Sequence, residues 1–219
     1  MLGLTYPKDV QCSVGSVDVD EFKRGYFPEG CPPSSHAILT FPKTAKTKGD
    51  ITLHWMDGGI QPARPEELGP NEVFGDGGNG VLFIGTKGKM MCGTYSENPQ
   101  LLPTSKTSQT KVKQKFARVP GDAEGHYAQW VEAAIAGYGK KEVSSPFDTA
   151  GPLTEALLMA NLAIRGYDIR TPKASGEGYD YPGRSVKLLW DNDNMRVTNF
   201  DAVNQFVKRD YRKGWSLGV

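Results

Sequence analysis

The sequence predicts an α+β domain in which a large, mostly antiparallel open sheet is covered by helices on one face. Three observations lead to this fold class. Short β-branched and aromatic runs fill the first half of the chain, two helical patterns follow over residues 122–165, and only short patterns remain after them. Strands that precede helices, rather than alternating with them, are typical of this class. We expect a single domain over residues 1–219, which is long enough for a sizeable core.

The first strands are expected in the N-terminal quarter of the chain. Residues 10–19 alternate apolar and polar side chains with a slip near Gly15, which predicts a strand with a bulge. Residues 36–41 and 51–55 are β-branched or aromatic runs, and a turn rich in lysine and glycine joins them. These two runs therefore predict a hairpin with an exposed, basic connection.

A second hairpin is expected after a long irregular loop. Residues 58–79 hold many glycines and prolines and have almost no periodicity, which predicts an ordered loop. The runs at 81–85 and 90–95 flank a turn that contains glycine, so they predict a hairpin. Residues 103–122 are polar, and no acid lies between the five basic residues at positions 106–118, which favours a solvated loop.

Two helices and several short pieces complete the chain. Residues 122–136 place apolar side chains at steps of three and four, with Asp122 as a candidate N-cap. Residues 152–165 begin with Pro152 and are apolar almost all round, which predicts a buried helix. After an irregular segment and two strand fragments, we expect a final helix of about ten residues that begins after Asn199 or Asp201, from its helical spacing.

Composition excludes several classes of protein and site. A net charge of +1 gives no field that would attract nucleic acid, and no apolar stretch is long enough to span a membrane. The three cysteines and three histidines are widely spaced, so local sequence indicates neither a disulfide framework nor a metal site. A metal could be held only by residues that converge from distant parts of the chain.

One motif resembles a dinucleotide-binding fingerprint without its context. Gly75, Gly77 and Gly80 form a GxGxxG pattern, but the residues that follow form a strand rather than a helix. We therefore interpret these residues as turn glycines. The chain contains no nucleophile elbow, phosphate-binding loop or kinase motif, and we predict no catalytic residue in it.

Two local groups of residues are candidates for substrate binding. Residues 54–59 end a predicted strand and open the long loop, where a sheet often presents polar groups to a ligand. In this group Trp55, beside His54 and Asp57, could stack on a sugar while its neighbours form hydrogen bonds to it. His126 and Tyr127 lie near the start of a predicted helix, whose positive end favours bound hydroxyls or oxyanions. Structural packing for the first group, and an ordinary surface histidine for the second, are the alternatives.

Five segments spread over nearly the whole chain carry a family resemblance. They are WMDGGIQPARPEEL at 55–68, GNGVLFIGTKGKMMCGTY at 78–95, EGHYAQWVEAAIAG at 124–137, FDTAGPLTEALLMANLAIR at 147–165 and DYRKGW at 210–215. Together they resemble the C-terminal domain of the Gfo/Idh/MocA oxidoreductases, in particular the Bacteroidetes-type subgroup. The resemblance implies the fold of the C-terminal domain of glucose-fructose oxidoreductase, which is also of the glyceraldehyde-3-phosphate dehydrogenase type.

The resemblance also implies a function. Family members exchange a hydride between a sugar or polyol and NAD or NADP, which an N-terminal Rossmann domain holds, while the C-terminal domain shapes the substrate site and the oligomer. This chain lacks that domain, the family's lysine motif and its Asp-xxx-His pair. We therefore expect a truncated chain that is inactive alone and binds no cofactor, NAD or NADP being used by the full-length enzyme. Self-association through the open sheet face, a carbohydrate or polyol ligand and a cytoplasmic location are further expectations.

Two alternatives remain open at this point. The chain could be a stand-alone module without catalysis that oligomerises or binds carbohydrate. It could also be the C-terminal part of an NAD-dependent glycosidase of the same superfamily.

Overall fold

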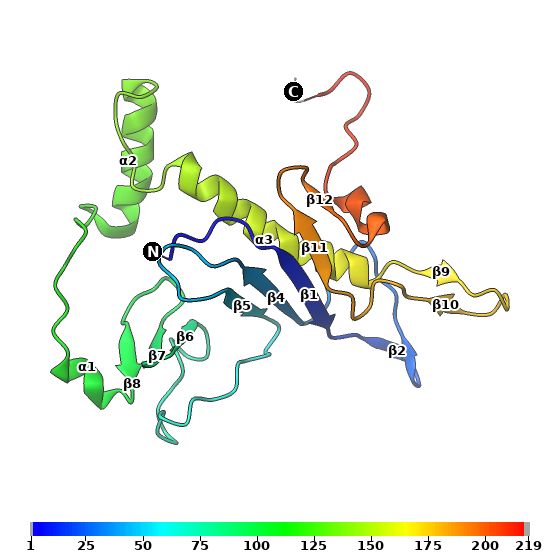
Figure 1. Cartoon of the computed structure of the whole chain (residues 1–219), viewed down its shortest axis with the longest axis horizontal. Helices are drawn as coiled ribbons and strands as arrows, with labels where there is room; N and C mark the ends of the chain where they lie inside the picture. Colours follow the sequence, from blue (N-terminus) through cyan, green and yellow to red (C-terminus); the bar gives the residue numbers. More distant parts are fainter. Residues whose placement is uncertain (1, 217–219) are drawn as a thin grey trace. The chain divides into compact units, whose positions relative to one another are not determined.

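The computed structural model describes residues 2–216, whose contacts form two compact units (Figure 1). The first unit comprises Met1–Ile60 with Ser145–Val219, and the second comprises Gln61–Ser144. Each unit has its own hydrophobic core.

A five-stranded antiparallel sheet forms the centre of the first unit. Its strand order is β12-β11-β1-β4-β5. The strands are β1 (Asp9–Val14), β4 (Ser35–Phe41), β5 (Ile51–Met56), β11 (Leu188–Asp191) and β12 (Arg196–Val197). Two small ribbons, a long helix and a 3₁₀-helix complete the unit: β2 (Asp18–Asp20) with β3 (Lys23–Arg24), β9 (Thr171–Pro172) with β10 (Tyr179–Asp180), α3 (Phe147–Tyr167) and η1 (Asp201–Phe206).

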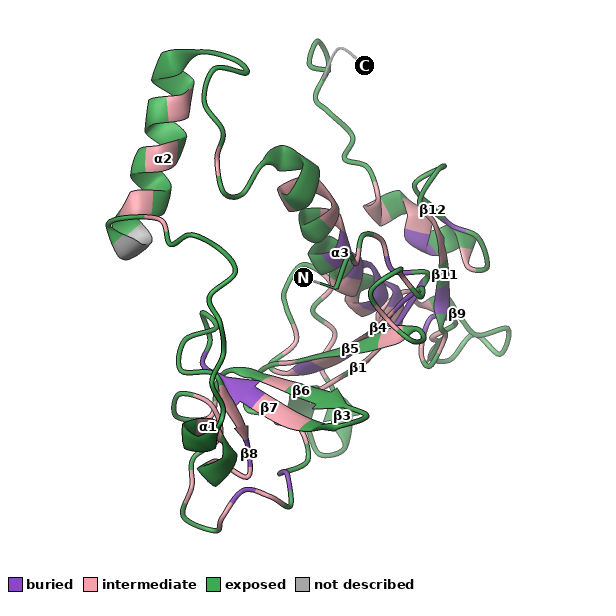
Figure 2. Ribbon diagram, turned by 60° about the vertical axis from the view of Figure 1, so that its left-hand side comes forward, coloured by how far each residue is buried: buried purple, intermediate pink, exposed green. Residues whose placement is uncertain are grey.

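One face of this sheet makes the core with α3. Residues on β4 alternate between buried and half-buried, as expected when only one face is covered. Ala37 and Leu39 of β4 belong to one buried cluster with Val10 of the neighbouring strand β1 and Met159 of α3. The buried residues of α3 lie along one stripe of the helix (Figure 2). The opposite face of the sheet, which we call the open face, carries the alternate residues of each strand.

The long helix differs from its prediction in two ways. It spans Phe147–Tyr167 rather than 152–165, and Pro152 lies inside it. The backbone N–H groups of Thr149 and Ala150 donate to the carbonyl of Pro146, so the first turn forms before Pro152. The prediction that this helix is buried on all sides was also wrong. Three leucines outside the buried stripe are at least half exposed: Leu153, Leu157 and Leu158.

The second unit is built on a three-stranded antiparallel sheet, β6-β7-β8. The hairpin of β6 (Val81–Gly85) and β7 (Gly88–Cys92) confirms its prediction, and β8 (Gln100–Leu102) pairs with β7. A small core of Leu68, Met91 and Leu102, with Phe74 and Leu82 against it, lies on one face. Two helices follow, α1 (Ser105–Gln109) and α2 (Asp122–Ala136). The short helix α1 lies within residues 103–122, where we expected only a loop. The helix α2 has Gly121 as its N-cap, whereas we expected Asp122 in that position.

The fold class α+β is confirmed, but the expected large open sheet is wrong. The strands form a five-stranded sheet, a three-stranded sheet and two ribbons. The loop before β6 separates the second hairpin from β5 in sequence, and this hairpin buries its apolar side chains in a core of its own. The C-terminal helix is also shorter than expected, because η1 is a six-residue 3₁₀-helix.

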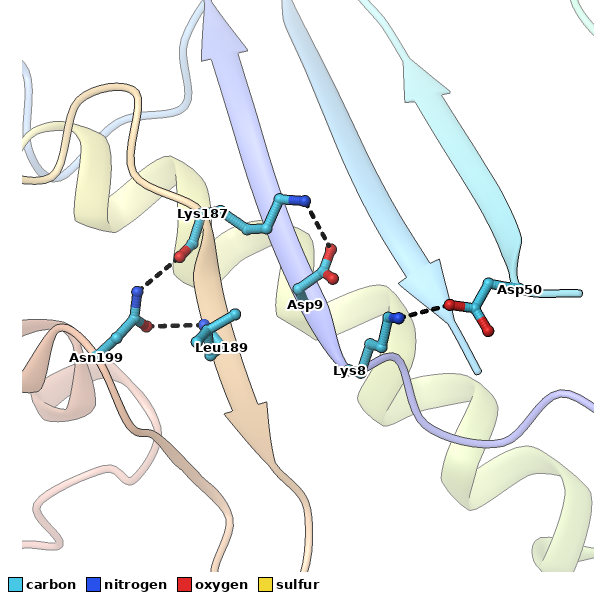
Figure 3. Close-up of polar contacts among 6 residues, drawn as sticks. All are labelled: Lys8, Asp9, Asp50, Lys187, Leu189 and Asn199. Carbon is cyan, nitrogen blue, oxygen red and sulfur yellow. Dashed lines mark hydrogen bonds and ion pairs between the residues drawn. The ribbon is translucent and has the colours of Figure 1, made fainter. Parts of the chain in front are cut away.

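Polar contacts hold the strands of the first unit at their ends (Figure 3). Lys8 donates to Asp50 over 2.5 Å, and buried Asp9 has the ammonium of Lys187 4.0 Å away. The side chain of Asn199 accepts a hydrogen bond from the N–H of Leu189 and donates to the carbonyl of Lys187, each over 2.8 Å. Asn199 therefore satisfies backbone groups along the outer side of β11.

Candidate functional site

Trp55 lies on β5, the last strand of the five-stranded sheet. Its register partner is Ala37, so its side chain projects on the face that α3 covers. Ala37 is fully buried, whereas Trp55 is 51% exposed. An indole that keeps one exposed side at a sheet edge can stack on the apolar face of a sugar ring.

Asp57 forms a tight corner with Ser35. One carboxylate oxygen accepts the N–H of Ser35 over 2.6 Å, and the other accepts its hydroxyl over 2.9 Å. The N–H of Asp57 in turn donates to the carbonyl of Ser35 over 3.0 Å. Ser35 is 2% exposed, so both of its donors depend on this carboxylate. The observed contacts of Asp57 are therefore those of a residue that fixes the chain where β5 ends.

Gly58 completes the same corner. Its φ is +63°, and a Cβ at this position would lie 2.1 Å from the carbonyl oxygen of Pro33. Only glycine fits such a close crossing of two backbone segments.

His126 and Tyr127 lie in the second turn of α2, in the second unit. The Nδ1 atom of His126 is 3.2 Å from the hydroxyl of Ser144, and the side-chain carbonyl of Gln129 accepts the N–H of Ser144 over 2.7 Å. The loop after α2 therefore folds back on the helix beside His126. Tyr127 is 75% exposed. Its ring and the imidazole are both accessible to a ligand.

The four predicted residues are thus divided between the units. Trp55 and Asp57 belong to the first unit, and His126 and Tyr127 belong to the second. Within each pair the residues are sequence neighbours. All four side chains are exposed. Asp57 also has a structural role, because it accepts two hydrogen bonds from Ser35.

Sequence reasoning missed a pair of histidines on the open face. The Nε2 atom of His36 lies 2.9 Å from the Nδ1 atom of His54, and the rings are stacked with centroids 5.2 Å apart. The pKa of His36 is lowered, first by burial and then by the charge that His54 can carry. Alternation along the predicted hairpin places 36 and 54 on one face, but the pairing register, which only the structure shows, brings them together.

The two histidines do not belong to a larger metal-binding cluster. Over the part of the chain that the structure describes, no three or more His, Cys, Asp or Glu side chains are arranged to hold a metal ion.

The glycine motif has the geometry of a turn. Gly75, Gly77 and Gly80 all have positive φ, and a Cβ on Gly80 would lie 2.2 Å from the carbonyl oxygen of Cys92. The strand β6 begins at Val81, immediately after the motif. A dinucleotide pyrophosphate needs the N-terminus of a helix at this place, so these residues do not fit NAD or NADP.

No protein-family model matches the chain, and no curated protein is significantly similar to it in sequence. Among the described residues, no helix is both long and apolar enough to cross a membrane.

Proposed function

We propose that this chain is the substrate-binding and oligomerisation domain of an NAD(P)-dependent sugar or polyol oxidoreductase of the Gfo/Idh/MocA type. The proposal rests on the resemblance of five ordered segments and on one structural observation. That observation is an antiparallel sheet that has a helix on one face and none of its core cluster on the other. Such a sheet suits a domain that presents its second face to another surface.

The composition of the open face supports self-association. Register places Ile38, Met56 and Leu189 there, among polar side chains from the same strands. Leu189 is 44% exposed. A mixed face of this kind resembles the surface of a homodimer interface, which is partly apolar and carries hydrogen-bonding groups. A second copy of the chain is the partner that we propose for it.

Exposed aromatic side chains support a carbohydrate or polyol ligand. Trp55 in the first unit, and Tyr127 with His126 in the second, offer rings for stacking and polar atoms for hydroxyl groups. In this proposal each unit offers its own sugar contact, and none of these residues transfers the hydride or the proton. Asp57 contributes indirectly, by holding the chain that carries Trp55.

The nicotinamide cofactor belongs to a separate domain in this proposal. When bound, NAD or NADP would accept or donate the hydride. The present chain contributes residues that hold the sugar carbon in place, which lowers the entropic cost of the reaction.

Ligand binding tests the proposal directly. Saturation-transfer NMR with a panel of neutral hexoses and cyclic polyols is expected to detect binding that weakens in Trp55→Ala or Tyr127→Ala. The matched control is Tyr95→Ala, because Tyr95 is 90% exposed and is not one of the proposed contacts. Binding of no sugar or polyol, or equal loss in the control, would contradict the substrate role. A dissociation constant for NADH in the low micromolar range would contradict the prediction that this chain binds no cofactor.

Sedimentation velocity tests the oligomer. We expect concentration-dependent self-association that weakens by about tenfold in Leu189→Lys, because a charge at an interface core is costly to desolvate. Val73→Lys is the control, since Val73 is 59% exposed in the second unit. A chain that stays monomeric at high concentration contradicts association through the open face.

A further inference from the structure

The second unit has a hollow on the outer face of its sheet. Leu82, Met91 and Leu102 point into the small core, so the alternate residues point away from it. Cross-strand pairing places Phe83, Met90 and Leu101 in one row on this outer face. The next pair on the same face is Gly85 with Gly88. Neither has a side chain, and this gap lies beside the apolar row.

The hollow is large enough for a small ligand. Its volume is about 460 Å³, which lies within the range of ligand sites. Its lining combines the apolar row and the two glycines with residues of the hairpin turn, β8 and α1, among them Lys87 and Lys106. All of these residues belong to the second unit.

Charge in the lining is one-sided. Three lysines and no acid are among the residues that line the hollow. Register pairs Lys89 with Leu102 on the core face, where its ammonium donates a hydrogen bond to the carboxylate of Glu67 over 2.8 Å. This hydrogen bond lowers the pKa of Glu67, which keeps the carboxylate charged. Within residues 2–216, Lys87 and Lys106 form no ion pair. The charge of Lys106 also lowers the pKa of Glu67, so this ammonium lies near a carboxylate without bonding to it. Lys87 and Lys106 therefore border an apolar surface without a bonded counter-charge.

We infer that this hollow binds a small organic anion with an apolar body, a carboxylate on an aliphatic or aromatic group. The row of Phe83, Met90 and Leu101 would bury the body, and Lys87 and Lys106 would face the carboxylate. Apolar area supplies most of the affinity and the lysines select for charge. The site is separate from the sugar contacts proposed above and does not depend on them.

Hexanoate is a suitable probe, with 1-hexanol and acetate as partial analogues. The alcohol keeps the apolar chain without the charge, and acetate keeps the charge without most of the chain. Amide signals of Gly85 and Gly88 in a nitrogen–proton NMR spectrum of the whole chain report on the hollow. We expect hexanoate to shift them saturably with a dissociation constant of about 1 mM or tighter. The alcohol should bind about three- to tenfold more weakly, and acetate at least about tenfold more weakly.

Two variants and one control complete the test. Lys87→Gln with Lys106→Gln should weaken hexanoate to the level of hexanol, whereas Lys113→Gln, an exposed lysine outside the lining, should change nothing. Gly85→Leu should abolish binding, because its side chain would fill the hollow. Gly85 does not have a positive φ, and a Cβ there would make only ordinary contact, 3.4 Å from the carbonyl oxygen of Gly88. Equal binding of hexanol and hexanoate, or no saturable shift with any probe, would overturn the inference.

Discussion

Replacement of Asp57 by alanine should destabilise the first unit strongly. The carboxylate accepts two hydrogen bonds from Ser35, one from its backbone and one from its hydroxyl. Ser35 is 2% exposed, so alanine leaves two buried donors without an acceptor. An unsatisfied buried donor costs about 1 to 3 kcal/mol. Because Asp57 is itself exposed, water can partly replace it, and we expect about 2 to 4 kcal/mol in total.

Asparagine separates the loss of charge from the loss of the acceptor. In Asp57→Asn the side-chain carbonyl can still accept the N–H of Ser35, and the amide can donate to the hydroxyl oxygen. We expect this variant to lose about 1 kcal/mol. The control is Glu29→Ala, an exposed acid of the same unit, with a change below about 0.5 kcal/mol.

Urea unfolding measures these changes. The urea concentration at the midpoint of unfolding should be highest for Glu29→Ala, lower for Asp57→Asn and lowest for Asp57→Ala. The slope of the free energy of unfolding against urea concentration should be the same in all three. An alanine variant as stable as the control would refute the assigned role of this corner. Lost sugar binding at unchanged stability would instead make Asp57 a ligand contact.

Three further predictions concern one buried and two half-buried side chains of the first unit. Met159→Ala should lower the free energy of unfolding by about 2 to 5 kcal/mol, since Met159 is 1% exposed in the core. Burial, and then the charge of Asp168, raises the pKa of Cys12 to about 12, so a thiol reagent at pH 8 should modify exposed Cys31 rapidly and Cys12 only on unfolding. The pKa of His36 is lowered in the folded chain, so the unfolded chain binds a proton more readily. The free energy of unfolding should therefore be constant above about pH 6.5 and fall as the pH drops below it. In His36→Gln this fall should be smaller.

Each of these has a contrary outcome. A Met159→Ala midpoint equal to that of wild type would place the helix elsewhere than on the sheet. Rapid modification of Cys12 in the folded chain, with kinetics matching Cys31, would show that its strand is open. Equal pH profiles of wild type and His36→Gln between pH 7.5 and 5.5 would remove the histidine from the explanation. The carboxyl groups with lowered pKa values do not interfere, because their ordinary values are 3.8 and 4.5.

Local sequence determined the parts of the fold that have a strong period. The hairpin of β4 and β5 and the hairpin of β6 and β7 lie where alternation and turn residues placed them. The helix α2 begins at Asp122, as predicted, although its N-cap is Gly121 rather than Asp122. Periodicity succeeds here because each element buries one face of its own.

The failures depend on contacts between distant residues. Nothing local indicated that β7 would pair with β8, or that Met91 would pack with Leu68 in a separate core. The start of α3 was misplaced because Pro152 is typical of a first turn, whereas Phe147 already lies in helical conformation. The contact between His36 and His54 depends on pairing register. The role of Asp57 depends on Ser35, which is 22 positions away.

The side chain of Asn199 has a consequence for how sheets of neighbouring molecules could join. By occupying backbone groups of Leu189 and Lys187, it leaves only the two-residue strand β12 at that end of the sheet. At the other end, β5 presents six residues as the last strand. A sheet with one usable edge can pair with one neighbour and then stops, whereas a fibre needs two. Strand addition to this five-stranded sheet would therefore end at a closed pair of molecules.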